Sequence, residues 1–67
     1  KVRFHDEQIN KTGIIDIVDY KNQIIYDFKF GYPNKSPEML NNTIQMQWDR
    51  KNMNNWPSFI IKPKIKY

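Results

Sequence analysis

β-Branched and aromatic residues are concentrated in two neighbouring stretches of the chain, residues 14–20 and residues 23–30. Lys21-Asn22 separates them, a polar pair that ends in a residue tolerant of positive φ. This pattern predicts a β-hairpin with a two-residue loop. The turn-forming residues 31–35 end the second strand.

Residues 1–12, which precede this hairpin, are polar and of mixed charge. Val2 and Phe4 alternate with polar residues, which allows a short strand. Gly13 predicts a break between this stretch and the hairpin.

Helical signals follow the hairpin. Ser36 can cap a helix whose first position is proline and whose first turn carries an acidic residue. Leu40, Ile44 and Trp48 recur at a spacing of four, with Met39 and Thr43 beside them. The pattern predicts one amphipathic helix of about four turns that ends at the asparagine-rich residues 52–55.

The apolar residues 58–62 predict a final short strand, which Pro63 ends. A strand, a helix and a returning strand predict a right-handed crossover with parallel pairing. The continuous run Phe59-Ile60-Ile61 favours a strand buried on both faces. The expected fold class is α/β: a β-hairpin, one crossover helix and a parallel strand in a mixed sheet.

Composition limits the chain to a single small domain. It has 67 residues and no cysteine, so neither a disulfide nor a cysteine-based zinc site can stabilise it. Eleven lysine and arginine residues against seven acidic ones give a net charge of +4, which suits a nucleic acid or an acidic protein partner. No apolar run is long enough for a transmembrane helix, and no secretory signal is visible. We expect residues 1–67 to be the core of one domain and a fragment of a longer protein.

The predicted hairpin places two acidic residues together. With Lys21-Asn22 as the loop, Val18 lies opposite Ile25, and Asp16 therefore lies opposite Asp27 on the same face of the sheet. Like charges in such positions destabilise a sheet unless something compensates them. A Mg²⁺ ion does so, since it is bound through one or two carboxylates.

Two further residues complete the argument from strand geometry. Lys29 lies two residues beyond Asp27 and shares its face, whereas Asp19 has the opposite parity and points away. Two carboxylates and a lysine on one face are sufficient for metal-assisted hydrolysis of a phosphodiester, in which the ammonium stabilises charge that develops on the phosphate.

Asp16, followed after ten residues by Asp27-Phe28-Lys29, resembles the signature of the PD-(D/E)xK nucleases, which have the restriction-endonuclease fold. The resemblance covers residues 13–62, where the family has a hairpin, a helix and a further strand. The stretches GIIDIVDYKNQIIYDFKF and NWPSFIIKPK look like the C-terminal nuclease domains of bacterial polymorphic toxins of the Rhs and contact-dependent types. Ile15 stands where the family often has proline, and residues 1–12 leave no room for the family's N-terminal helix.

The resemblance implies a Mg²⁺- or Mn²⁺-dependent endonuclease that cuts DNA, or alternatively RNA. It implies a delivered toxin that acts in the cytoplasm of a target cell, and an immunity protein in the cell that produces it. Asp16 and Asp27 would bind the metal together with the carbonyl of Phe28, and Lys29 would be catalytic. The helix offers Gln47, or alternatively Gln45, as a further polar contact.

Other interpretations remain open at this stage. The chain could be a non-enzymatic, basic interaction module that binds nucleic acid or an acidic protein through Lys62, Lys64 and Lys66. It could equally be a structural half-domain that a second chain completes, and its oligomeric state is open. For Trp48 and Trp56, core packing is favoured over stacking on bases. For the single histidine, His5, and for Glu7, a place on the surface is favoured over catalysis or metal binding.

Overall fold

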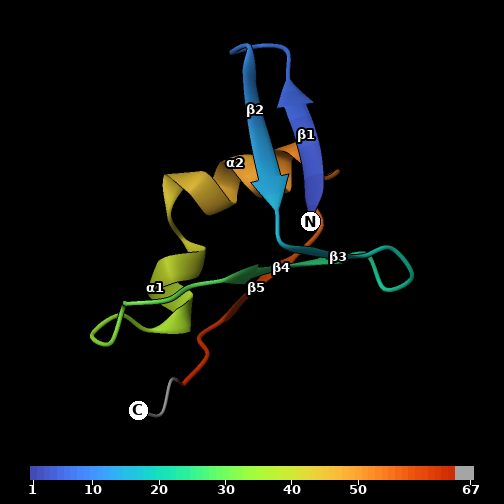
Figure 1. Cartoon of the computed structure of the whole chain (residues 1–67). Coiled ribbons are helices and arrows are strands. Elements are labelled where there is room, and N and C mark those ends of the chain that lie inside the picture. The colour runs from blue at the N-terminus through green and yellow to red at the C-terminus, as the bar shows by residue number, and fades with distance from the viewer. Residues whose placement is uncertain (65–67) are drawn as a thin grey trace.

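The computed structural model describes residues 1–64, which form an α/β domain with two small sheets and two helices (Figure 1). One sheet is an antiparallel pair, and the other is mixed with strand order β3-β4-β5. The elements in chain order are β1 (Val2–Asp6), β2 (Lys11–Ile15), β3 (Ile17–Asp19), β4 (Ile24–Phe28), α1 (Pro37–Asn41), α2 (Ile44–Asn52) and β5 (Ser58–Ile61). The predicted α/β class is confirmed, and so is the parallel return strand, since β5 runs parallel to β4.

The pairing of β3 with β4 has the predicted register, with Val18 opposite Ile25. The predicted two-residue loop is wrong, because the strands end earlier and residues 20–23 form the turn. The Asp19 carboxylate accepts hydrogen bonds from the backbone and side-chain nitrogens of Asn22, at 3.1 and 2.8 Å. With Asn22 held in this way, the positive φ of 57° falls on Gln23.

The predicted continuous strand over residues 14–20 is wrong, because the chain bends at Asp16. Ile15 ends β2 in one sheet, and Ile17 begins β3 in the other. At the bend, Asp16 Oδ2 accepts the backbone N–H of Phe28 at 2.9 Å. A side-chain carboxylate thus satisfies a donor of β4 that a backbone carbonyl would otherwise satisfy at the point where the backbone leaves the sheet.

The N-terminal residues form a complete hairpin, β1–β2, where the sequence pattern allowed a short strand. Gly13 does not break the chain; it lies inside β2, opposite Phe4. The Phe4 ring covers it so closely that a Cβ at Gly13 would be 2.3 Å from Phe4 Cζ. The same ring meets Trp48 of α2 edge-on, at 4.9 Å between centroids. The glycine therefore permits a close approach of an aromatic ring.

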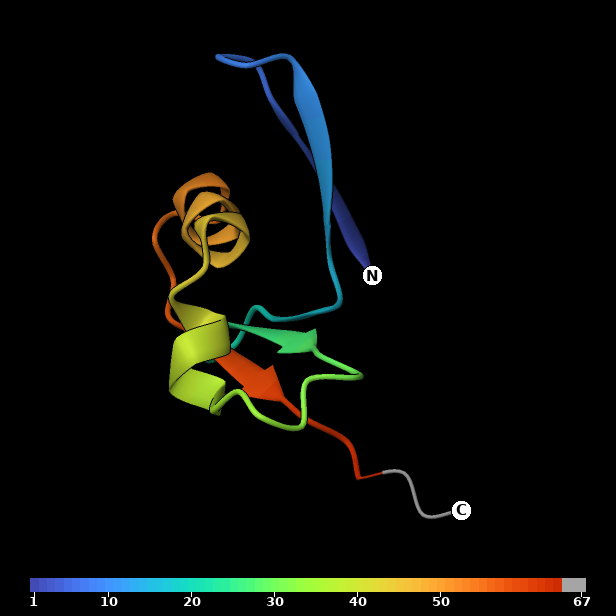
Figure 2. The ribbon, with the colours of Figure 1, turned by 90° about the vertical axis from the view of Figure 1, so that its left-hand side faces the viewer.

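A buried carboxylate fixes this hairpin to α2, beside which it stands in Figure 2. Asp6, at the end of β1, accepts hydrogen bonds from Trp48 Nε1 at 2.6 Å and from Asn52 Nδ2 at 3.1 Å. Both donors lie on α2. The side-chain hydrogen bonds from Asn52 and Trp48 hold the pKa of Asp6 below its usual value.

The predicted single helix is wrong, because the chain forms two helices separated by Asn42 and Thr43. Ser36 caps α1 as predicted, with Met39 N–H donating to its hydroxyl at 3.2 Å. Thr43 caps α2 in the same way, and so starts a new helix axis there.

The predicted apolar stripe does not survive this break. Leu40 is buried, but Ile44 is 85% exposed. Met46 and Asp49 face inward from α2, while Trp48 is half-buried against the hairpin. The reason is that a stripe of period four holds only along one helix axis.

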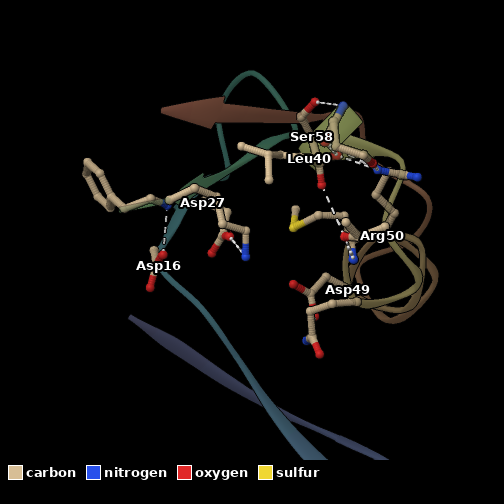
Figure 3. Close-up of polar contacts among 12 residues, drawn as sticks. Asp16, Asp27, Leu40, Asp49, Arg50 and Ser58 are labelled. Carbon is tan, nitrogen blue, oxygen red and sulfur yellow. Dashed lines mark hydrogen bonds and ion pairs between the residues drawn. The ribbon is translucent and has the colours of Figure 1, made fainter. Parts of the chain in front are cut away.

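The buried core lies between the mixed sheet and the helices. It consists of Ile15, Ile25, Leu40 and Met46. A polar cluster closes it at the start of β5, where Arg50 Nη1 donates to Ser58 Oγ at 2.7 Å and to the Asn41 carbonyl at 2.8 Å (Figure 3). These contacts join β5 to both helices.

The opposite face of the mixed sheet is open. Tyr26 and Phe59 are register partners and pack at 6.1 Å on this face. Phe59 is 53% exposed, so the prediction of a final strand buried on both faces is wrong. The reason is that the helices cover one face of β5: Ser58 is buried against them, and Phe59, the next residue, points to the opposite face. Within residues 1–64, no helix is long and apolar enough to span a membrane.

Candidate active site

Asp27 lies near the end of the central strand β4, with its side chain on the buried face of the mixed sheet. It is 9% exposed, and it alternates along the strand with Ile25, a residue of the core. Lys29 follows two residues later, and its Nζ lies 2.6 Å from Asp27 Oδ2. The predicted sharing of a face by Asp27 and Lys29 is therefore confirmed.

Asp16 approaches the same point from the bend between β2 and β3. Its Oδ2 accepts the N–H of Phe28, the residue between Asp27 and Lys29 (Figure 3). This bond fixes the carboxylate beside the end of β4. The bend thus brings Asp16 to Asp27, as the register predicted, although Asp16 itself lies outside the strand.

The two carboxyl groups influence each other in opposite directions. Burial raises the pKa of Asp27, and the neighbouring Asp16 carboxyl raises it further, against the effect of Lys29. Burial also acts on Asp16, but hydrogen bonds from Asp27 and from the Phe28 N–H outweigh it, so the pKa of Asp16 is lowered. Two adjacent carboxyls resist joint ionisation. Asp27 therefore holds a proton more readily, and Asp16 is the ionised partner.

Lys29 remains a cation in this setting. Burial alone would lower its pKa, but the contact with Asp27 reverses the effect and the pKa is raised. The ammonium is thus a donor of hydrogen bonds and positive charge at neutral pH, and is unsuited to act as a base.

Asp49 of α2 is a third acidic residue that faces the pair, and the sequence pattern did not predict it. It is 3% exposed, and burial raises its pKa to about 6, although a hydrogen bond from Gln45 opposes the shift. The charges of Asp27 and Lys29 act on it as well. Figure 3 shows it on α2, on the side of the sheet to which Asp27 points. The only sign of this residue in the sequence was the spacing of four between Gln45 and Asp49, which places the two side chains next to each other on a helix.

The two glutamines proposed from the sequence lie in different surroundings. Gln45 Nε2 donates to Asp49 Oδ1 at 3.0 Å and so reaches the candidate site through that carboxylate. Gln47 is exposed, and its Nε2 donates to the carbonyl of Asn42 at 2.9 Å. The fold therefore connects Gln45, the second choice from the sequence, to the acidic residues.

The carbonyl of Phe28 can be placed from the ladder of hydrogen bonds. Ile25 and Lys29 donate their N–H groups to the β5 side, so the intervening even-numbered residues of β4 face the β3 side. Phe28 confirms this, since its N–H reaches Asp16. Its carbonyl points to the same edge as its N–H and thus shares the side of the strand on which Asp16 lies.

The remaining candidates lie away from this cluster. His5 Nδ1 lies 3.1 Å from Thr12 Oγ1 on the first hairpin, and Glu7 is exposed in its turn. Trp48 packs on Phe4, and Trp56 packs edge-on against Tyr20, at 6.0 Å. Lys66, one of the three C-terminal lysines proposed for an interaction surface, lies outside the described residues.

The donor set fits a hard divalent cation. Asp27 Oδ2 is buried, and the ammonium of Lys29, 2.6 Å away, is its partner. Its neighbours are a second carboxylate and a cation, and oxygen ligands are what Mg²⁺ prefers. The described residues hold no cluster of three or more acidic, histidine or cysteine side chains close enough to bind a metal. A cation here would take two carboxylates from the protein.

Comparisons with protein-family models, curated proteins and solved structures found no match to this chain.

Proposed function

We propose that the protein is a metal-dependent phosphodiester hydrolase, an endonuclease with a restriction-endonuclease-like core. Asp16 and Asp27 hold Mg²⁺ or Mn²⁺ with the carbonyl of Phe28, and Lys29 is the catalytic lysine. The observation that carries the proposal is the buried Asp27 carboxylate, which is flanked by the Asp16 carboxylate and by Lys29, whose Nζ lies 2.6 Å from Asp27 Oδ2.

The divalent cation would supply Lewis-acid chemistry, stabilising charge on the phosphate and making the attacking water easier to deprotonate. Hydrolysis adds that water to phosphorus and releases one ester oxygen as an alcohol. Lys29 donates hydrogen bonds to phosphate oxygens as negative charge develops on them. Its raised pKa supports this role, because the ammonium stays charged throughout.

The protein's other groups orient this machinery. The Phe28 N–H fixes the Asp16 carboxylate through the 2.9 Å hydrogen bond, and the sheet fixes Asp27. Asp49, hydrogen-bonded to Gln45, adds negative charge opposite the pair and so favours a cation between them. Gln47, with its bond to Asn42, belongs to the helix surface.

The biological setting is proposed from the resemblance of the Asp16 and Asp27-Phe28-Lys29 pattern to the nuclease domains of polymorphic toxins. On this basis the substrate is DNA. The protein is a delivered effector that acts in the cytoplasm of a target cell, and an immunity protein protects the cell that makes it. The basic net charge of +4 supports a polyanionic substrate.

The direct test is cleavage of supercoiled plasmid DNA, of single-stranded DNA and of RNA, with Mg²⁺, with Mn²⁺ and with a chelator. Metal-dependent cleavage should fall on the order of 10²–10³-fold in Lys29→Ala, the scale for removal of one charge-stabilising donor. Asp27→Ala should fall at least as far, while Gln47→Ala should retain activity. Absence of cleavage of plasmid DNA, single-stranded DNA and RNA under both metals would refute the proposal.

One further variant distinguishes a basic interaction module from a nuclease. If the chain only binds a polyanion, replacing both acids in Asp16→Asn/Asp27→Asn removes repulsion and leaves binding intact or tighter, and no cleavage occurs in the native chain either. If the chain is a nuclease, the double variant binds substrate but has lost metal-dependent cleavage.

A further inference from the structure

A cleft of about 600 Å³ adjoins the candidate active site. It lies between the chain that follows β4, the start of α1 and the chain that follows β5. Lys29 lines it, so the residue that pairs with Asp27 also borders the cleft. A ligand in the cleft would therefore lie beside a residue of the candidate active site.

The lining combines positive charge with flat apolar surface. Lys62 and Lys64 line the cleft together with Lys29, and none of the lining residues is acidic. Lys62 Nζ donates one hydrogen bond, to the Lys35 carbonyl at 2.5 Å, and an ammonium has three hydrogens to donate. Its charge lies beside the cleft, and no carboxylate of residues 1–64 forms an ion pair with it.

Tyr32 gives the cleft an aromatic surface, and three prolines supply rigid apolar walls. The Tyr32 ring is exposed, and the ammonium of Lys35 lies 5.8 Å from its centroid. An anion with a flat ring is the ligand that matches these features together. A nucleotide has both parts, a phosphate for the lysines and a base for the aromatic ring.

We propose that this cleft binds an unpaired nucleotide of the substrate strand, its base stacked on Tyr32 and its phosphates held by Lys62 and Lys64. The substrate is then single-stranded or locally unpaired nucleic acid. In a duplex both faces of a base are covered by its neighbours, so a base enters such a cleft only where pairing is absent or broken. The inference deepens the proposed nuclease function and rests on it, because the bound strand is a substrate only if the protein is a nuclease.

The test measures binding and not cleavage. Fluorescence anisotropy of a labelled oligothymidylate, and of a duplex with the same number of phosphates, is followed in a chelator. The single strand should bind more tightly. Tyr32→Ala should weaken its binding about five- to hundred-fold, the range for loss of one stacking contact, and Tyr32→Phe should retain it. Phe30→Ala provides a control, because Phe30 is 57% exposed and does not line the cleft.

The lysines are tested through salt dependence. Lys62→Gln and Lys64→Gln should each reduce the slope of log affinity against log salt by about 0.7, the value for one contact to a single-stranded phosphate. Lys51→Gln makes the same change of charge on α2, where Lys51 Nζ contacts Gln8, and should leave the slope unchanged.

Three outcomes would overturn the inference: duplex bound as tightly as the single strand, wild-type affinity in Tyr32→Ala, or equal competition by polyglutamate, which would indicate an acidic protein partner. Failure of the proposed function looks different. Selective binding that depends on Tyr32, with no cleavage under any metal, would support the nucleotide cleft and refute the nuclease.

Discussion

Lys29 Nζ lies 2.6 Å from Asp27 Oδ2, a buried carboxylate oxygen. Both side chains are largely shielded from water, with relative exposures of 21% and 12%. Removal of either partner therefore leaves a charge that the solvent compensates poorly.

We expect Lys29→Met to lower the free energy of unfolding at pH 7 by about 1–3 kcal/mol, the cost of a buried charged group without its partner. Asp27→Asn/Lys29→Met should recover most of that loss. Urea denaturation of the wild type, both single variants and the double variant measures the coupling. Additive effects in this cycle would contradict an energetic link between the two groups.

Divalent metal should stabilise the fold through the two carboxylates. At a Mg²⁺ concentration ten times the dissociation constant, the expected gain is about 1.4 kcal/mol. Thermal unfolding with and without Mg²⁺ measures it, and Asp16→Asn should abolish the increment. Asp19→Asn is the matched control, because Asp19 contacts Asn22 in the hairpin turn. If Mg²⁺ still stabilised Asp16→Asn, the metal would bind at a site other than the Asp16 and Asp27 carboxylates.

Asp49 should make stability fall as the pH rises. Its pKa is about 6 in the folded chain and 3.8 as a model value, so between these limits the folded state binds more protons than the unfolded state. The contribution is fully present below about pH 4 and is lost through pH 6, with a size of about 2–3 kcal/mol. Asp49→Asn should flatten this dependence in urea denaturation at pH 4, 5, 6 and 7.

Asp27, whose pKa is also raised, contributes in the same direction. The comparison with Asp49→Asn isolates the share of Asp49. A variant with the same pH dependence as the wild type would show that Asp49 is not the titrating group.

Gly13 should tolerate no side chain while Phe4 covers it. Gly13→Ala would place a Cβ 2.3 Å from Phe4 Cζ and push the Phe4 ring away from Trp48. We expect the free energy of unfolding to fall by about 1–3 kcal/mol. Stability is read from urea denaturation followed by tryptophan fluorescence. In the Phe4→Ala background the same substitution should cost much less, and an equal cost there would argue against the steric explanation.

The sequence by itself determined the central part of this protein. Alternation and turn residues were sufficient to pair Val18 with Ile25 and to place Asp27 and Lys29 on one face. The order of strand, helix and strand was sufficient to predict that β5 runs parallel to β4. The capping role of Ser36 could also be predicted from the sequence. These features depend on spacing along one or two adjacent strands or on one helical turn, so local chemistry encodes them.

Tertiary structure decided the rest. The break at Asp16 depends on the Phe28 N–H, twelve residues away, and the first hairpin depends on contacts of Phe4 and Asp6 with α2. The break between α1 and α2 set which face of α2 turns inward, and so placed Asp49 opposite Asp27. The spacing of Gln45 and Asp49 allows their hydrogen bond, but it does not show that Asp49 is buried, because burial depends on the sheet that packs against α2.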